Sequence, residues 1–248
     1  MYKKEDLLKQ LAAIGVDPTG TLKVHLSYRE IGAVDGRADT VIDALLEYMQ
    51  AGLLVLASHT WWHTTEKNPV MDVLHTKSCV GIVPELFRKY PNVHRSLHPT
   101  HAVAAVGKDA LEFVTGDERV NTPAGIGGAY WKLWERDAQI LLIGVNFNRN
   151  TFIHGIEEWD GAVGTLAKEP TDLYVINHAG QRLHTPLYLH AARNGSETFS
   201  KLEPQAIQAG ILTFGKFGDA TTRLMSARKL RAMVAPILAE DPEYLLRY

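Results

Sequence analysis

The amino-terminal part of the chain alternates between amphipathic and apolar segments. Apolar residues recur at helical spacing over Lys3–Ile14 and stop at Gly15, which predicts an opening helix. Thr21–Ser27 is predicted to form a strand, Asp39–Gln50 a helix and Leu53–Ser58 a second, apolar strand. This order is typical of a βαβ unit, in which a helix joins two parallel strands.

The same pattern recurs further along the chain. Two more apolar strands are predicted over His101–Gly107 and Gln139–Val145, with helices over Ser78–Tyr90 and Tyr130–Glu135. Strands that are apolar throughout must be covered on both faces. We therefore expect an α/β fold with a mainly parallel or mixed sheet flanked by helices.

The pattern of apolar and polar residues changes beyond Gly161. Asp172–Asn177 and Arg182–Leu189 flank a polar turn and predict an antiparallel hairpin. Glu197–Gln208 and Ala220–Glu240 are predicted to be helical. Because the chain has neither a low-complexity linker nor an internal repeat, we expect a single α/β domain over residues 1–248, with the hairpin as an inserted lobe.

Composition excludes several classes of protein. With 26 Lys and Arg against 28 Asp and Glu among 248 residues, the chain is not a strongly basic nucleic-acid binder. Its single cysteine, Cys79, permits no internal disulfide. No apolar run is long enough to span a membrane, and no apolar segment follows the charged amino terminus. We expect a cytoplasmic protein with no membrane or nucleic-acid partner.

Two glycine-rich segments resemble nucleotide-binding motifs but are incomplete. Gly210–Lys216 matches the start of a phosphate-binding loop, yet Phe217 stands where a hydroxyl would hold magnesium. Gly125–Tyr130 lacks the third glycine of the dinucleotide fingerprint and follows Pro123 rather than a strand. A flexible loop that faces a ligand is the interpretation we retain for the second segment.

The 11 histidines leave a metal site open as an alternative. His59 and His63 are four residues apart, and His94, His98 and His101 form a second group. Two histidines on one helix face can bind zinc in a hydrolase. Pro99 interrupts the second group, however, and no glutamate completes a zinc-protease pattern. Hydrogen-bonded loop or core histidines are the other interpretation.

Four segments taken together carry a family resemblance. They are Val24–Gly32, Arg95–Gly107, the strand Leu141–Val145 that leads into Asn150–Glu157, and Gly215–Ala220. In these segments, and in their order from Leu7 to Leu246, the sequence resembles the aminoglycoside 3-N-acetyltransferase family. The resemblance implies an acetyl-CoA-dependent enzyme of a group that is distinct from the GNAT acetyltransferases, and one that needs no metal.

Asn150–Glu157 follows an apolar strand and opens a helix, which is where α/β proteins bind ligands. His154 and Glu157 are three residues apart, so their side chains can share one helix face. A carboxylate beside an imidazole orients the ring and raises its proton affinity. The resemblance assigns these two residues the catalytic role: His154 takes a proton from the substrate amine as the amine attacks the thioester.

The resemblance also implies which residues face the cofactor. His25, Ser27 and Tyr28 would meet the acyl arm, although Leu26 replaces a serine that is usual in the family. The remaining candidates for cofactor binding are Arg95, Ser96, His98, Gly127, Gly128 and Lys216. Charge alone suggests Lys216 as a phosphate partner, and a surface lysine is the alternative; for Arg95 the alternative is a surface ion pair.

The expected acceptor is a small-molecule amine. Aminoglycosides are polycations, so a cleft rich in carboxylates is expected for them. The two segments that would supply it, His59–Lys67 and Leu187–Asn194, contain few acidic residues. Trp61 and Trp62 can stack on a sugar or cover the core, and with His190 they are the candidate substrate contacts. We therefore predict an acetyl-CoA-dependent N-acetyltransferase with an aminoglycoside as the family-implied acceptor. The alternatives are another amine, a metal hydrolase or a catalytically silent acyl-CoA-binding protein.

Overall fold

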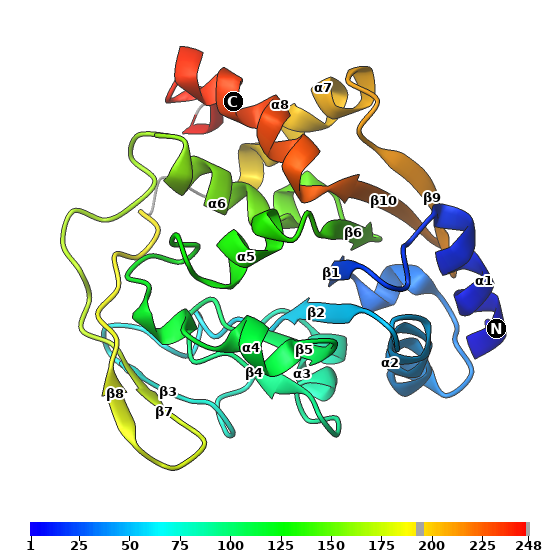
Figure 1. Ribbon diagram of the computed structural model, residues 1–248, viewed down its shortest axis with the longest axis horizontal. Coiled ribbons are helices and arrows are strands. Elements are labelled where there is room, and N and C mark those ends of the chain that lie inside the picture. The colour runs from blue at the N-terminus through cyan, green and yellow to red at the C-terminus, as the bar shows by residue number, and fades with distance from the viewer. Residues whose placement is uncertain (192–195, 247–248) are drawn as a thin grey trace.

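A seven-stranded mixed sheet runs through the computed structural model, which describes residues 1–191 and 196–246 (Figure 1). The strand order is β4-β5-β2-β1-β6-β10-β9. Its strands are β1 (Thr21–Leu26), β2 (Leu53–Ala57), β4 (His94–Arg95), β5 (Val103–Gly107), β6 (Gln139–Ile143), β9 (Thr213–Phe217) and β10 (Ala220–Ser226). β1 pairs in parallel with both β2 and β6, whereas the outer strands pair antiparallel. The predicted α/β fold with a mixed sheet is confirmed.

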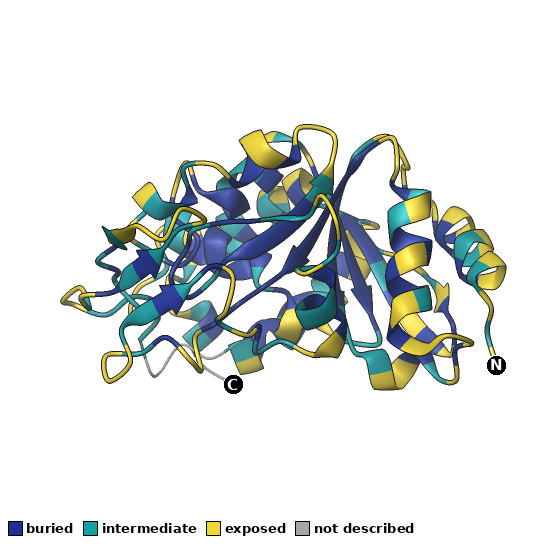
Figure 2. Ribbon diagram, turned by 90° about the horizontal axis from the view of Figure 1, so that it is seen from below, coloured by how far each residue is buried: buried dark blue, intermediate teal, exposed yellow. Residues whose placement is uncertain are grey.

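Helices cover both faces of this sheet, as the apolar strands require (Figure 2). Alternate residues of each strand enter different cores: Leu54 packs with α1, α2 and α3, and Val55 packs with the helices of the other face. The helices are α1 (Lys4–Ile14), α2 (Arg37–Tyr48), α3 (Ile82–Phe87), α4 (Ala110–Val114), α5 (Ala129–Glu135), α6 (Phe152–Trp159), α7 (Leu202–Gln208) and α8 (Ala227–Glu240). Short 3₁₀ helices are η1 (Tyr28–Ile31), η2 (Asp117–Arg119), η3 (Phe147–Arg149), η4 (Ser196–Lys201) and η5 (Tyr244–Leu246).

A small second sheet forms the predicted hairpin lobe. β7 (Tyr174–Ile176) and β8 (Arg182–His184) pair antiparallel around a turn in which Gly180 has a φ of 76°. β3 (Val70–Asp72) adds a third strand, parallel to β7. The lobe is thereby tied to the segment that follows β2.

Two helix predictions were wrong in extent. Ala220–Glu240 is helical only from Ala227, because residues 220–226 form β10, in which Thr222 and Leu224 are buried and Thr221 is exposed. This alternation, with two β-branched threonines, favours a strand. The helix predicted over Ser78–Tyr90 is limited to α3, which begins after Gly81. Within the described residues, no helix has both the length and the apolar composition of a membrane span.

Candidate active site

A cavity of about 860 Å³ lies where the three parallel strands end. Residues that follow β1, β2 and β6 line it, and β1 lies between the other two strands, so all three carboxyl ends meet at one edge. β5 runs in the opposite direction, and its amino-terminal end therefore brings Thr100 and His101 to the same edge. Leu189 and His190 from the lobe complete the wall.

His154 and Glu157 form a buried pair on α6. His154 Nδ1 donates to Glu157 Oε2 at 2.7 Å, and the two residues are 7% and 1% exposed. Since Glu157 occupies Nδ1, Nε2 is the ring nitrogen left for a ligand in the cavity that His154 lines. Burial lowers the pKa of His154 well below 6.5, and charge on His190 or His59 acts in the same direction. The ring is therefore neutral near pH 7 and can accept a proton.

Three more histidines surround this pair. The ring of His190 lies 4.1 Å from that of His154 between centroids, and the ring of His101 lies 5.2 Å from that of His190. His59 follows at 4.8 Å from His101 and forms a hydrogen bond of 2.7 Å with the hydroxyl of Tyr130. Burial is the main cause that lowers the pKa values of His59 and His101. The sequence singles out His59 and His101 individually only as possible metal ligands, within segments expected near the site, and does not connect them to His154.

The metal hypothesis finds no ligand set. His59 and His63 lie in a turn-containing loop rather than on a helix face. Across residues 1–191 and 196–246, no three His, Cys, Asp or Glu side chains converge in a way that could hold a metal ion.

The end of β1 contributes the predicted acyl-arm residues to the cavity wall. His25, Ser27 and Tyr28 all line the cavity. His25 is 8% exposed, and its Nε2 atom is buried with no hydrogen-bond partner among the described residues. Burial and the neighbouring Lys23 lower the pKa of His25, so its ring is neutral. A neutral imidazole with a free nitrogen fits a carbonyl or amide of a bound ligand.

Comparison with known proteins identifies the family. Residues 24–239 match the family model described as aminoglycoside 3-N-acetyltransferase. The chain belongs to this family of acetyltransferases. It is 32% identical over 245 residues to aminoglycoside N(3)-acetyltransferase IV of Salmonella sp, an alignment that covers 97% of this chain and 89% of the relative. It is also 31% identical over 180 residues to the SPbeta prophage-derived aminoglycoside N(3')-acetyltransferase-like protein YokD of Bacillus subtilis (strain 168). That alignment covers 61% of this chain and 63% of the relative.

Solved structures of aminoglycoside acetyltransferases share the fold. AAC(3)-IVa, as a histidine-to-alanine mutant in complex with a gentamicin, superposes with a TM-score of 0.85 at 26% identity, covering 100% of this chain and 92% of that one. AAC(3)-Xa superposes with a TM-score of 0.87 at 23% identity, covering 98% of this chain and 94% of that one.

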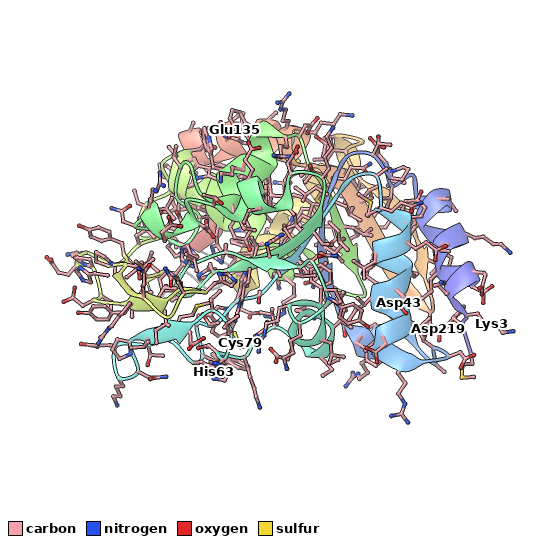
Figure 3. The ribbon with its side chains drawn as sticks, turned by 60° about the horizontal axis from the view of Figure 1, so that its bottom comes forward. Lys3, Asp43, His63, Cys79, Glu135 and Asp219 are labelled. Atoms are coloured by element: carbon pink, nitrogen blue, oxygen red, sulfur yellow. The ribbon has the colours of Figure 1, made fainter. Side chains whose placement is uncertain are left out.

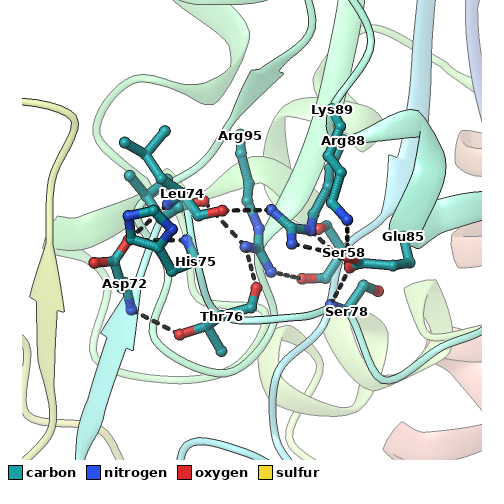
Figure 4. Close-up of polar contacts among 11 residues, drawn as sticks. Ser58, Asp72, Leu74, His75, Thr76, Ser78, Glu85, Arg88, Lys89 and Arg95 are labelled. Carbon is teal, nitrogen blue, oxygen red and sulfur yellow. Dashed lines mark hydrogen bonds and ion pairs between the residues drawn. The ribbon is translucent and has the colours of Figure 1, made fainter.

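Arg95, a family-implied cofactor residue, is turned into the protein (Figure 4). It is 3% exposed, and its guanidinium donates to the carbonyl oxygens of Val73 at 3.1 Å, Thr76 at 2.6 Å and Ser58 at 2.9 Å. Burial lowers its pKa to about 9. Arg95 thus clamps the segments after β2 and β3 and is not among the residues that line the cavity. The alternative of a surface ion pair does not hold, since the side chain is buried.

Ser96 and His98 likewise support the cavity wall through hydrogen bonds to its backbone. Ser96 Oγ accepts the amide of Val103 at 3.0 Å. His98 Nδ1 accepts the amides of Thr100 at 3.2 Å and His101 at 2.9 Å, which fixes the turn that carries both residues into the cavity. Neither Ser96 nor His98 lines the cavity. Both side chains instead hold the backbone of residues beside it.

The last three cofactor candidates lie outside the cavity lining. Gly127 and Gly128 precede α5, and the carboxylate of Asp117 already accepts the first amide of that helix, from Ala129, at 2.8 Å. Lys216 lies on the edge strand β9, and its Nζ donates to the carbonyl oxygen of Asp219 and to the hydroxyl of Thr221, both at 3.2 Å. Figure 3 shows Asp219 beside α1, well away from Cys79 in the cavity wall.

The rim of the cavity carries the two tryptophans and two charged residues that the sequence did not single out. Trp61 and Trp62 are 38% and 69% exposed and meet edge to face at 4.8 Å, so they do not cover the core. Glu66 and Arg149 are the charged residues other than histidine among the described lining residues. Arg149 directly precedes the segment Asn150–Glu157, and this position in the sequence could have indicated that Arg149 lies near the site. Residues 192–194 of the segment predicted to be poor in acids lie outside the described residues.

Proposed function

We propose that this chain transfers acetyl from acetyl-CoA to an amine of an aminoglycoside, with His154 as the general base. The pair of His154 and Glu157, opening into the cavity of about 860 Å³, carries this proposal. Family membership supports acetyl transfer. Structures of mutant AAC(3)-IVa with a gentamicin and with apramycin, at 26% identity, support the aminoglycoside.

In the proposed reaction His154 Nε2 takes a proton from the acceptor nitrogen while that nitrogen attacks the thioester carbonyl carbon. The C–N bond forms, the C–S bond breaks, and the proton passes to the sulfur of the leaving coenzyme A. Glu157 holds Nδ1–H and balances the positive charge that develops on the ring. No acyl-enzyme is required.

The residues of the β1 end would bind the acyl arm. Acetyl-CoA supplies the acetyl group as a co-substrate. The unpartnered Nε2 of buried His25 fits a carbonyl of that arm, and the hydroxyls of Ser27 and Tyr28 fit the neighbouring amides. Trp61 and Trp62 offer flat, exposed faces to the acceptor at the rim.

The charge of the cavity favours a second candidate, an amine that is less cationic than an aminoglycoside. Among the described lining residues Glu66 is the sole carboxylate, and Arg149 opposes it. A polycation gains little attraction from such a wall.

Release of free thiol from acetyl-CoA separates these possibilities. We expect release with gentamicin or apramycin, and loss of at least ~100-fold in kcat for His154→Ala, the usual effect of removing a general base. Calorimetry should show unchanged binding of coenzyme A to this variant. Release with simple monoamines alone would select the second candidate, and near-wild-type turnover of His154→Ala would remove His154 from the mechanism.

A further inference from the structure

A second pair of histidine and glutamate stands beside the first. His190 Nε2 donates to Glu158 Oε1 at 3.0 Å, and the side chains are 14% and 3% exposed. The ring centroids of His190 and His154 lie 4.1 Å apart, and the two ring planes are tilted by 34° relative to each other. Both rings line the cavity. The consecutive residues Glu157 and Glu158 of α6 thus each serve a different histidine.

Glu158 is fixed independently of His190. Both of its carboxylate oxygens lie 3.1 Å from the amide of Ala124, which donates to them. A buried carboxylate that accepts such bonds is held in one orientation. Because Glu158 occupies Nε2, the ring of His190 presents Nδ1 to a ligand. Among the described residues, His154 on α6 and His101 before β5 contact the ring of His190, and His59 interacts with it electrostatically.

The chemistry of the acceptor requires two proton transfers. An aliphatic amine is protonated near neutral pH and has no lone pair for attack. One proton must leave before attack and another as the C–N bond forms. His154 alone accepts one of them.

We infer that His190, oriented by Glu158, is a second catalytic base that takes the first proton from the ammonium form of the acceptor. This inference rests on the proposed acetyl transfer. His190 Nδ1 takes one N–H proton and leaves a neutral amine. His154 Nε2 then takes a second as the amine attacks, and that proton goes to the departing sulfur. The proton on His190 passes to solvent, so the balance is ammonium plus thioester to amide, thiol and one free proton.

The close approach of the two rings suits two successive proton transfers from one nitrogen atom. Two rings with centroids 4.1 Å apart can both reach an acceptor nitrogen placed roughly 3 Å from each. Two imidazolium rings at this distance repel each other, and each has its own carboxylate to balance the charge. His190 is the more exposed of the two side chains, at 14% against 9%, which favours proton release from it.

The test compares two acceptors in thiol-release assays of His190→Gln and Glu158→Gln. One acceptor is a strongly basic aminoglycoside amine, and the other is hydroxylamine, a weak base that is already neutral at pH 8. We expect a loss of ~100-fold in kcat/KM with the aminoglycoside, as for removal of a general base, and a loss of less than about threefold with hydroxylamine. With the aminoglycoside, the residual rate of the variants should rise about tenfold per pH unit, following the fraction of free amine.

The controls isolate this role from a structural one. His184→Gln removes a comparable but exposed pair, in which His184 lies 2.9 Å from Asp172, and should leave both rates unchanged. His154→Ala should lose activity with both acceptors. Glu158→Gln keeps an oxygen for the Ala124 amide, so it tests the inference even if His190→Gln fails to fold. Equal losses with both acceptors, or no loss with the aminoglycoside, would overturn the inference alone. Absence of thiol release by the wild-type protein would refute the proposed function and this inference with it.

Discussion

Replacing Glu157 by glutamine is the most direct test of how the His154 pair works. The amide keeps the shape of the side chain and an oxygen that can accept Nδ1–H, while the negative charge disappears. The bond is 2.7 Å long and Glu157 is 1% exposed, so solvent does not screen the charge. A hydrogen bond to a charged group contributes about 1.5–3 kcal/mol. Because this energy acts on the imidazolium that forms during attack, kcat should fall roughly 10- to 150-fold.

The pH profile distinguishes this electrostatic role from damage to the fold. Glu157 favours the protonated ring, and its loss therefore lowers the pKa of His154 further. The acid limb of the profile of kcat/KM should move to lower pH while its plateau falls. The assay is thiol release between pH 5 and 9, with thermal unfolding in parallel and Glu135→Gln, an exposed glutamate labelled in Figure 3, as the matched control. An unchanged plateau with an unmoved acid limb would refute the reasoning.

Three further predictions concern the supporting structure. Arg95→Met leaves the buried carbonyl oxygens of Val73 and Ser58 and the partly buried one of Thr76 without their donor. It should lower the free energy of unfolding by about 3 kcal/mol, measured in urea against the exposed control Arg29→Met; equal stabilities would contradict the clamp. Lys216→Ala should leave KM for acetyl-CoA within about twofold in steady-state kinetics, because Lys216 is not among the cavity-lining residues; a large rise would restore it as a phosphate ligand. The histidines with lowered pKa values (His25, His59, His101 and His154) protonate more readily in the unfolded chain. Stability should therefore be fully present above pH 6.5 and fall by up to about 1.4 kcal/mol per histidine for each pH unit below it; a flat urea midpoint from pH 7 to 5 would contradict this.

Local patterns predicted most of the fold. The βαβ unit from Thr21 to Ala57 and the strand at Gln139 follow from periodicity alone, since each buries a continuous apolar face. β10 was missed because its alternation directly precedes a genuine helix, and the combined stretch looks amphipathic at either period.

The site was predictable where its residues are close in sequence. His154 and Glu157 share a helix face at a spacing of three, and the structure joins them. His190 and Glu158 are 32 residues apart, so only the tertiary fold brings them together. The family motif around Arg95 identified an important segment, but residue type does not reveal whether a guanidinium faces a phosphate or three carbonyl groups of its own chain.

The exposed tryptophan pair at the cavity rim gives the protein an intrinsic optical signal. Of the five tryptophans in the chain, Trp131, Trp134 and Trp159 form a separate aromatic cluster around Arg231. Among the described residues that line the cavity, Trp61 and Trp62 are the only tryptophans, and both are open to solvent. Fluorescence that an added quencher removes therefore comes mainly from this pair, and its protection by a ligand reports occupancy of the cavity without any turnover.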